Sequence, residues 1–328
     1  MIGSSSAVQP SVSPGARRGF IRELRGLSHD CGWPRSLGKG ARCDIRSAWA
    51  KSCARRTHAE GSSHTILPTL QARGLTPIPS SHSNQQHRTL LLTGASRGIG
   101  HATVKRFSAA GWRVITCSRH AFPENCPWEM GPEDHIQVDL ADLDQTQAAI
   151  AEIKQRLDTG ELNALVNNAA ISPKAEGGKR LSSIDTTIDV WDHIFRVNFF
   201  APIMLARGLL EELKAVKGSV VNVTSIAGSR VHPFAGAAYA TSKAALAALT
   251  REMAADFGPL GVRVNAIAPG EIDTAILSPG TEEIVAHQIP MHRLGTPDEV
   301  AKIIYVLCTE TSSYVNGAEI HINGGQHV

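Results

Sequence analysis

The sequence predicts an α/β fold: a doubly wound parallel sheet of about seven strands with helices on both faces, forming a single domain over residues 89–328. Three observations predict it. From residue 89 onward, short runs rich in β-branched and aliphatic residues alternate with segments of helical periodicity. The order is β-α-β throughout, which gives right-handed crossovers in one sheet. A glycine-rich turn separates the first run from the first periodic segment.

The elements follow in order along the chain. Strands are expected at 89–93, 113–117, 136–138, 164–166, 219–223, 263–267 and 319–322, and helices at 99–110, 143–157, 190–215, 238–257 and 297–307. Pro297, with Asp298 and Glu299 behind it, is a favourable helix start, because the acids lie at the positive end of the helix dipole. Residues 271–295 break the alternation and are expected to form a mobile flap over a substrate.

The glycine-rich turn reads Thr93-Gly-Ala-Ser-Arg-Gly-Ile-Gly100. Its glycines allow a tight turn and let backbone N–H groups approach a pyrophosphate at a helix N-terminus. A plain strand–helix connection is the alternative for such a turn taken alone. The turn is, however, followed in order by Asn167-Asn-Ala-Ala170, Ser225 and the pair Tyr239 and Lys243. This series favours a dinucleotide site.

Tyr239 and Lys243 are four residues apart at the start of an alanine-rich segment. In a helix, positions i and i+4 lie on one face, so the phenol and the ammonium face the same region. A lysine held near a tyrosine favours the phenolate, and we therefore expect the pKa of Tyr239 to be lowered toward the working pH of a general acid/base. The spacing alone is a weak signal; its strength comes from the motifs around it.

With these motifs the sequence resembles the short-chain dehydrogenase/reductase family, in its compact single-domain branch, over about residues 88–328. Residues 160–328 are similar to bacterial 3-oxoacyl-carrier-protein reductases. The resemblance is carried by Thr93–Gly100, Asp139, Asn167–Ala170, Asn198, Ser225, Tyr239, Lys243 and Pro269-Gly270. There are two departures: Ala170 stands where glycine is more usual, and the stretch from Ser225 to Tyr239 is one residue longer than the commonest spacing.

The resemblance implies an enzyme that transfers a hydride between a nicotinamide cofactor and a carbonyl or secondary alcohol. Tyr239 is the implied general acid/base, Lys243 binds the nicotinamide ribose, and Ser225 orients the carbonyl oxygen. Asn198 is expected to kink its long helix and to hold a water that links Lys243 to solvent; a weak helix former on a polar face is the alternative. A catalytically silent nucleotide-binding or scaffold protein on the same fold remains the alternative function.

Cofactor choice depends on the residues after the second strand, where the adenosine ribose binds. Ser118 and Arg119 replace an acid there, and Arg97 lies in the turn, so NADP(H) is favoured and NAD(H) stays possible. Both positions have an alternative to cofactor contact. Arg119 would then be a solvated charge in a loop, and Asp139 would be a simple turn aspartate. The expected cofactor contacts are Gly94, Ser96, Arg97, Gly98, Ile99, Gly100, Ser118, Arg119, Asp139, Leu140, Asn167, Ala169, Tyr239, Lys243, Pro269, Gly270, Ile272 and Thr274.

His232 and Phe234, between Ser225 and Tyr239, are the expected substrate contacts, with loop packing as the alternative. No metal is expected, since no metal-binding motif such as H-E-x-x-H is present.

The domain is acidic, with 20 Lys and Arg against 26 Asp and Glu, and it lacks the basic stripe of a nucleic-acid-binding surface. No apolar run is long enough to span a membrane. The family resemblance implies a homotetramer, or a homodimer, packed through alanine-rich helix faces; a face buried within the monomer is the alternative.

Residues 1–88 have a different composition. They contain 13 Lys and Arg against 4 Asp and Glu, are rich in Ser, Pro and Gly, and lack periodicity. We expect a disordered N-terminal extension; an organelle transit peptide and a start assigned too far upstream are the alternatives.

The six cysteines divide evenly between extension and domain, and Cys117 and Cys308 lie in apolar runs, as buried free thiols do. The expected location is cytoplasmic, or an organelle if the extension is a transit peptide.

Overall fold

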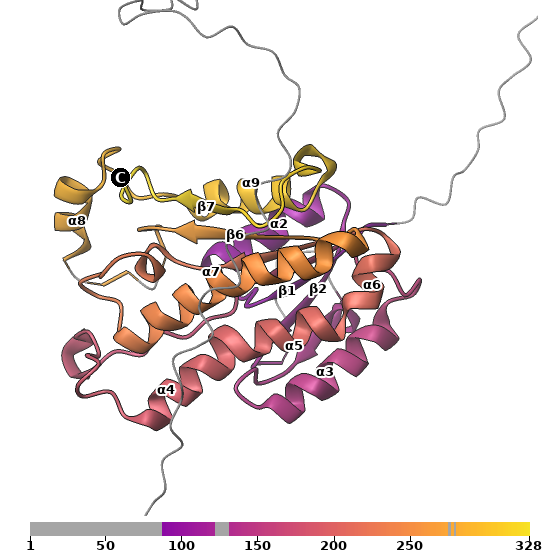
Figure 1. Cartoon of the computed structure of the whole chain (residues 1–328), viewed down its shortest axis with the longest axis horizontal. Helices are drawn as coiled ribbons and strands as arrows, with labels where there is room; N and C mark the ends of the chain where they lie inside the picture. The colour runs from indigo at the N-terminus through magenta and orange to yellow at the C-terminus, as the bar shows by residue number, and fades with distance from the viewer. Residues whose placement is uncertain (1–86, 122–130, 275–276, 279) are drawn as a thin grey trace, which may run out of the picture. The chain divides into compact units, whose positions relative to one another are not determined.

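Seven parallel strands form one sheet in the order β3-β2-β1-β4-β5-β6-β7 (Figure 1). The computed structural model describes residues 87–121, 131–274, 277–278 and 280–328, all within one compact unit, Ser80–Val328. The strands are β1 (Thr89–Thr93), β2 (Arg113–Ser118), β3 (His135–Gln137), β4 (Ala164–Asn167), β5 (Ser219–Val223), β6 (Arg263–Pro269) and β7 (Glu319–Ile322). The predicted α/β fold is therefore confirmed, and every predicted strand is found.

Strand order reverses direction between β1 and β4, since β2 and β3 lie on one side of β1 while β4 to β7 lie on the other. The connections leaving β1 and β4 therefore diverge to opposite faces of the sheet. In open α/β sheets the crevice beyond the carboxyl ends of such strands is where ligands bind. The glycine-rich turn leaves β1 at this crevice, and Asn168 follows β4 there.

The helices cover both faces of the sheet (Figure 1). They are α2 (Gly98–Ala109), α3 (Leu143–Arg156), α4 (Ile188–Phe195), α5 (Ala201–Gly208), α6 (Leu210–Ala215), α7 (Ala237–Phe257), α8 (Thr281–Gln288) and α9 (Pro297–Leu307). Caps fix several starts. The side chain of Asp142 accepts the N–H groups of Asp144 and Gln145 at α3, and Thr296 forms a capping box with Glu299 at α9.

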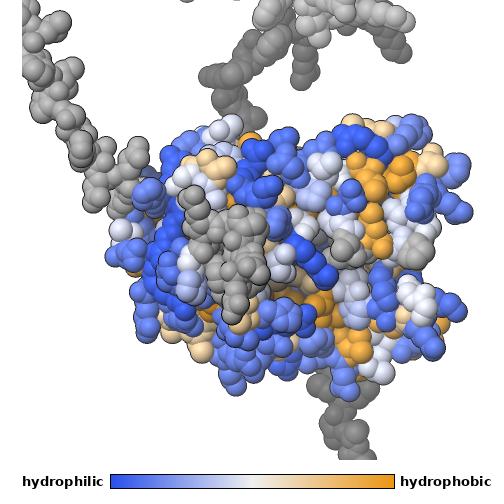
Figure 2. All heavy atoms as spheres, turned by 180° about the vertical axis from the view of Figure 1, so that it is seen from behind, coloured by the Kyte–Doolittle hydropathy of each residue, from blue (hydrophilic) through white to orange (hydrophobic). Residues whose placement is uncertain are grey.

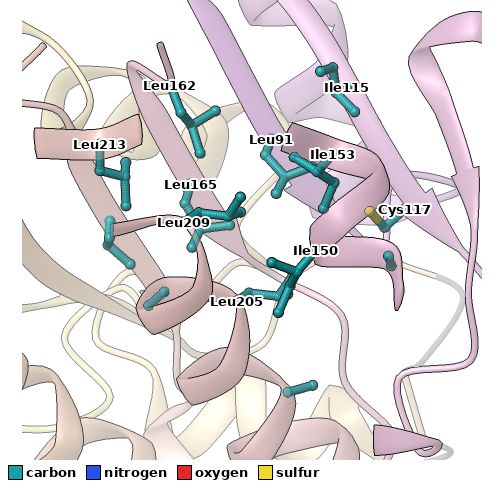
Figure 3. Packing of buried hydrophobic residues seen from close by; sticks show 14 of the residues in the cluster. Leu91, Ile115, Cys117, Ile150, Ile153, Leu162, Leu165, Leu205, Leu209 and Leu213 are labelled. Carbon is teal, nitrogen blue, oxygen red and sulfur yellow. The ribbon is translucent and has the colours of Figure 1, made fainter. Parts of the chain in front are cut away.

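Side chains of successive strand residues alternate between two buried cores. Leu91 belongs to the core under α3 and α5, shown in Figure 3, where it lies beside Ile153 and Leu165. Leu90 and Leu92 belong to the core under α2 and α9. All five residues of β1 are buried, as expected for an interior strand of a parallel sheet that is covered on both faces. Because the apolar side chains are gathered in these two cores, the face of the molecule in Figure 2 is largely hydrophilic, with hydrophobic residues in smaller patches.

The helix predicted over 190–215 is not continuous. It begins at Ile188, passes through a π-helical segment at Arg196–Phe200, and is interrupted again at Leu209. Hydrophobic periodicity runs through all these pieces, which explains why the sequence pattern merges them. The π segment widens the helix by one residue and places Asn198 in the interior, fully buried.

Residues 271–295 were expected to be an irregular flap, but they contain the helix α8. The two ends of the segment are also joined, because Ile272 and Gly295 form a parallel bridge and Gly295 donates a backbone hydrogen bond to Glu271. Gly280, with a φ of +89°, precedes the helix directly. A short helix between glycine- and proline-containing turns leaves little periodicity to detect in the sequence.

The expected extension, 1–88, lies outside the described residues except for its last two positions. Cys117 and Cys308 are free and buried, as predicted, while Cys126 lies outside the described residues. In the described part of the chain, no helix combines the length and apolarity needed to cross a bilayer.

Candidate active site

A cavity of about 650 Å³ lies beyond the carboxyl ends of the strands. Its wall is formed by the segments that follow β1, β2, β3, β4, β5 and β6, together with the start of α7. Residues that are distant in the sequence therefore meet at one site: the glycine-rich turn at one end, and Tyr239 with Lys243 at the other. This is the crevice that the strand order predicts.

Backbone packing at the turn requires glycine at two positions. A Cβ on Gly100 would lie 2.0 Å from the carbonyl oxygen of Gly94. Gly94 has a φ of +70°, and a Cβ there would lie 2.8 Å from the Cα of Ala169. The first turn of α2 thus packs directly on the β1 end, and its first N–H groups have no partner within the helix. Gly94 and Gly98 line the cavity, whereas Gly100 supports the turn from behind.

Asn168 fixes this turn to β4. Its Nδ2 donates to the carbonyl oxygens of Thr93 (3.0 Å) and Gly94 (2.9 Å). Its backbone N–H, and that of Ala169, donate to the Thr93 hydroxyl at 3.0 Å each. The predicted contact Asn167 lies elsewhere: its amide donates to Asn222 inside the sheet, and it does not line the cavity. Strand alternation explains the difference, since neighbouring side chains point to opposite faces.

Two arginines line the cavity near the glycine-rich turn and the end of β2. Arg97 in the turn and Arg119 after β2 are both exposed and both line the cavity. The Arg119 carbonyl accepts a 3.0 Å hydrogen bond from Gln137, and the Ser118 hydroxyl donates to the carbonyl of His120 at 2.9 Å. These bonds fix the backbone on either side of Arg119 and do not use its guanidinium group. Asp139 also lines the cavity, while its Oδ1 accepts the Ala141 N–H at 2.9 Å, as a turn aspartate does.

Asn198 connects three elements through its buried amide. Its Oδ1 accepts the Ile171 N–H at 2.9 Å, and its Nδ2 donates to the Ile171 carbonyl at 3.1 Å and to the Ser242 hydroxyl at 3.0 Å. Both amide hydrogens are therefore used by protein groups. The predicted helix irregularity is present as the π segment, the side chain lies behind the cavity wall, and a water held by Asn198 stays a prediction.

Ser225, Tyr239 and Lys243 lie together at the other end of the cavity. Ser225 follows β5 and hydrogen-bonds the Tyr239 hydroxyl. Lys243 is 2% exposed and donates a 2.6 Å hydrogen bond to the carbonyl oxygen of Val223. Its Nζ lies 5.9 Å from the centroid of the Tyr239 ring. The expectation that α7 presents both side chains to one region is met by this arrangement.

The electrostatics differ from the expectation for Tyr239. Burial raises the pKa of Tyr239, the Ser225 hydrogen bond acts in the opposite direction, and the charge of Glu271 raises it further. Burial lowers the pKa of Lys243 to about 7. The physical reason is that removal from water disfavours both charged forms, and a lysine that is only partly protonated near neutral pH stabilises a phenolate weakly.

The remaining wall carries polar groups. The predicted substrate contacts His232 and Phe234 both line the cavity. His232 Nε2 lies 2.5 Å from Oε1 of Glu271, and the Phe234 N–H donates to His232 Nδ1 at 3.2 Å. Lys174, on the loop after β4, donates to the Phe234 carbonyl. Sequence reasoning missed Lys174 and Glu271, although the position of Glu271 directly after Pro269-Gly270 was a usable signal.

The cavity gathers most of the predicted site residues, and only Gly100, Asn167 and Asn198 do not line it. It also contains residues that were not predicted: Cys117, His120, Val138, Asn168, Ala170, Ile171, Ser172, Lys174, His193, Val197, Val223, Thr224, Ile226, Ala227, Ala235, Glu271, Leu277 and Ser278. Most are small or apolar, and their types carry no chemical signal. Among the described residues, no group of three or more His, Cys, Asp or Glu side chains could hold a metal ion.

Comparison with known proteins defines the class. The sequence model of enoyl-(acyl carrier protein) reductases matches residues 94–327. The protein FixR of Bradyrhizobium diazoefficiens is 57% identical over 265 residues, which cover 77% of this chain and 95% of the relative. The 3-oxoacyl-[acyl-carrier-protein] reductase FabG of Aquifex aeolicus is 33% identical, covering 73% of this chain and 97% of the relative.

A solved structure supports the same class of protein. An oxidoreductase of the short-chain dehydrogenase/reductase family from Brucella ovis, in complex with a partially ordered NAD, is 68% identical; it covers 73% of this chain and 100% of its own, with a TM-score of 0.64. The chain belongs to the short-chain dehydrogenase/reductase family. It is accordingly an NAD(P)-dependent dehydrogenase/reductase, and the resemblance first recognised in its motifs is confirmed.

Proposed function

We propose that this chain transfers a hydride between NADP(H) and a carbonyl or secondary alcohol substrate, with Tyr239 as general acid/base. The observation that carries the proposal is the position of Tyr239. Its hydroxyl is hydrogen-bonded to Ser225, and both residues line the cavity that also contains the glycine-rich turn. A proton-transfer group and a nucleotide-binding turn in one cavity suit a reaction in which proton and hydride move together.

The residues present fit a dinucleotide. The approach of Gly100 to Gly94 leaves no room for a side chain, so the start of α2 can contact a pyrophosphate through its backbone. Ser118 and Asp139 would contact the adenosine, and the segment from Pro269 would hold the nicotinamide amide. The bound nicotinamide supplies or accepts the hydride. Every other part of the reaction comes from side chains of this chain.

Tyr239 protonates the carbonyl oxygen during reduction and removes the hydroxyl proton during oxidation. Ser225 donates to the same oxygen and orients it, a role that in comparable oxyanion sites contributes about 2.7–4 kcal/mol. Lys243 contacts the nicotinamide ribose and exchanges protons with Tyr239. Its pKa of about 7 suits this exchange, because a proton donor works best near the pH at which it operates.

Two arginines support NADP(H) as the preferred cofactor. Arg97 and Arg119 are exposed at the adenosine end of the cavity, and guanidinium groups bind phosphate through bidentate hydrogen bonds. NAD(H) is the second candidate, and a specific observation favours it: the Brucella ovis relative was solved with NAD. NADP(H) and NAD(H) differ by one 2′-phosphate, so the preference depends on whether the two arginines bind that group.

The organisation of the whole chain is also proposed. Residues 89–328 would form the catalytic domain and residues 1–88 a disordered extension, in the cytoplasm or, if the extension directs import, in an organelle. A homotetramer or homodimer would pack through α7, on which Ala244, Ala245 and Ala247 are half-buried and Ala248 is exposed. Small side chains on such a face allow close helix–helix approach between subunits.

The proposal is tested with the purified full-length protein. Binding of NADPH and of NADH is measured by fluorescence titration, and oxidation of the bound dinucleotide is then followed with a panel of ketones and 3-oxoacyl thioesters. We expect tight NADPH binding and turnover of at least one carbonyl compound. Tight binding without turnover would remove the catalytic part of the proposal and favour a silent nucleotide-binding protein. No binding of either nucleotide would overturn the proposal.

A further inference from the structure

The substrate end of the cavity contains an unusual set of polar side chains, Lys174, His232 and Glu271, which the hydride transfer itself does not use. All three line the cavity. The side chains of His232 and Glu271 are each 10% exposed, and their Nε2 and Oε1 atoms lie 2.5 Å apart. Buried polar groups of this kind are costly unless they are hydrogen-bonded, so they need a partner when a substrate displaces water.

The hydrogen bonds fix the orientation of this pair. Nδ1 of His232 accepts the backbone N–H of Phe234 at 3.2 Å, which assigns the ring proton to Nε2. Nε2–H then donates to Oε1 of Glu271. Within the part of the chain that the structure describes, Oε2 of Glu271 accepts no hydrogen bond from the protein. The imidazole therefore holds the carboxylate at the cavity wall with one acceptor oxygen available.

The carboxylate lies close enough to affect the reacting group. Its charge adds to the effect of burial in raising the pKa of Tyr239. Burial lowers the pKa of Lys174, and the charge of Glu271 opposes that shift. Lys174 is itself fixed by its hydrogen bond to the carbonyl oxygen of Phe234, the same residue whose N–H orients His232. The backbone at Phe234 thus holds His232, and through it Glu271, as well as Lys174, in the cavity that Tyr239 also lines.

We propose that Glu271 and Lys174 select a neutral, hydroxylated substrate, an α-hydroxy ketone or the corresponding diol, whose second oxygen binds between them. This inference rests on the proposed hydride transfer and specifies its substrate class. A hydroxyl can donate to the carboxylate and accept from the ammonium at once. A plain alkyl group would leave Oε2 of Glu271 and the remaining N–H donors of Lys174 without partners, a carboxylate substrate would be repelled by Glu271, and an amine by Lys174.

The test compares two ketones that differ by one hydroxyl group, 3-hydroxy-2-butanone and 2-butanone. Values of kcat/KM are measured with the full-length protein and NADPH. We expect a preference for the hydroxy ketone of about 10- to 100-fold, the cost of leaving a buried charged acceptor unpaired. Glu271→Gln keeps the acceptor for His232 but removes the charge, and it should reduce this preference at least about tenfold.

Two further variants complete the experiment. Lys174→Gln should also reduce the preference, whereas Glu283→Gln, at an exposed position on α8, should keep it at the wild-type value. Equal kcat/KM for the two ketones in the wild type, or equal losses for both in Glu271→Gln and Lys174→Gln, would overturn the inference. Turnover of 3-oxoacyl thioesters but of neither ketone would also overturn it, with hydride transfer intact. Absence of turnover with every carbonyl compound would instead overturn the proposed function.

Discussion

The side-chain nitrogen of Lys243 lies 5.9 Å from the centroid of the Tyr239 ring and is buried beneath it, bonded to the backbone carbonyl of Val223. One turn of α7 therefore brings a proton donor and a titratable amine to the same end of the cavity. The most direct tests of the mechanism therefore change these two side chains one at a time.

Tyr239→Phe removes the proton that the mechanism needs and keeps the ring. We expect kcat to fall about 10²–10⁴-fold, since that is the usual contribution of a general acid/base, while the Kd for NADPH stays within about twofold. Steady-state turnover and fluorescence titration measure the two quantities on one preparation. Activity at the wild-type level in this variant would show that another group transfers the proton.

Lys243→Met should increase stability while it abolishes activity. The pKa of Lys243 is lowered from 10.5 to about 7, so between these values the unfolded chain holds a proton that the folded chain does not. Stability consequently rises with pH through this window, and the full penalty of about 3–5 kcal/mol applies at and below about pH 7. Leaving the Val223 carbonyl unpaired costs about 1–3 kcal/mol, so we expect a net gain of about 1–3 kcal/mol at neutral pH.

Chemical denaturation at about pH 7 and again above about pH 10.5 checks this prediction, since the advantage of Lys243→Met should disappear at the higher pH. Lys105→Met, at an exposed position on α2, is the matched control and should show no such pH dependence. A Lys243→Met variant that is less stable than the wild type at both pH values would contradict the buried-amine interpretation.

Glu271→Gln should shift the pH profile of alcohol oxidation to lower pH. Oxidation requires the Tyr239 phenolate, so its rate rises as pH passes the pKa of Tyr239. Burial, and then the Glu271 charge, raise this pKa, while Ser225 lowers it. Removing the charge at Glu271 therefore lowers the pKa, and the rising limb of kcat against pH moves in the acid direction. A profile that is unchanged, or moves to higher pH, would mean that the carboxylate does not act on Tyr239.

Gly100→Ala should damage the nucleotide site through sterics. The added Cβ would lie 2.0 Å from the carbonyl oxygen of Gly94, a backbone atom that cannot move without the turn. We expect a loss of about 1–3 kcal/mol in the free energy of unfolding, and weaker NADPH binding. Gly160→Asn is the control, because a Cβ at Gly160 meets nothing within 4 Å and asparagine tolerates its φ of +67°. Equal effects in the two variants would argue against a special role for the turn.

Arg119→Asp tests the cofactor preference. Replacing the guanidinium with a carboxylate should raise the KM for NADPH at least about tenfold, because the acid repels a 2′-phosphate, and should affect NADH much less. The measurement is kcat/KM for both reduced dinucleotides with one carbonyl substrate. An unchanged NADPH/NADH ratio would leave Arg119 as a solvated charge and favour NAD(H).

The strands and the gross site could be predicted because their signals are local. Each strand is a short apolar run, and the turn at Gly94 needs glycine for reasons of backbone geometry alone. The interruption at Asn198 could be anticipated only as an irregularity, since a π turn depends on which buried groups the asparagine meets. Helix α8 was missed because it is short and its apolar periodicity is weak.

The charges of the site could not be predicted in the same way. Proximity of Tyr239 and Lys243 follows from their spacing, but the direction of the Tyr239 pKa shift depends on burial, which a sequence does not display. The different roles of Asn167 and Asn168 could not be predicted from the sequence either. Only the register of β4 decides which of two adjacent, identical side chains faces Asn222 in the sheet and which one fastens the turn.

The π segment at Arg196–Phe200 amounts to a one-residue insertion whose effect stops within a single turn. In an α-helix each residue advances the direction of a side chain by about 100°, so deleting one residue here would close the wide turn into an ordinary one. The helices on either side could remain packed, yet Asn198 would no longer meet both Ile171 and Ser242. The π segment is therefore a place where the direction of one supporting side chain is set separately from the packing of the helices on either side.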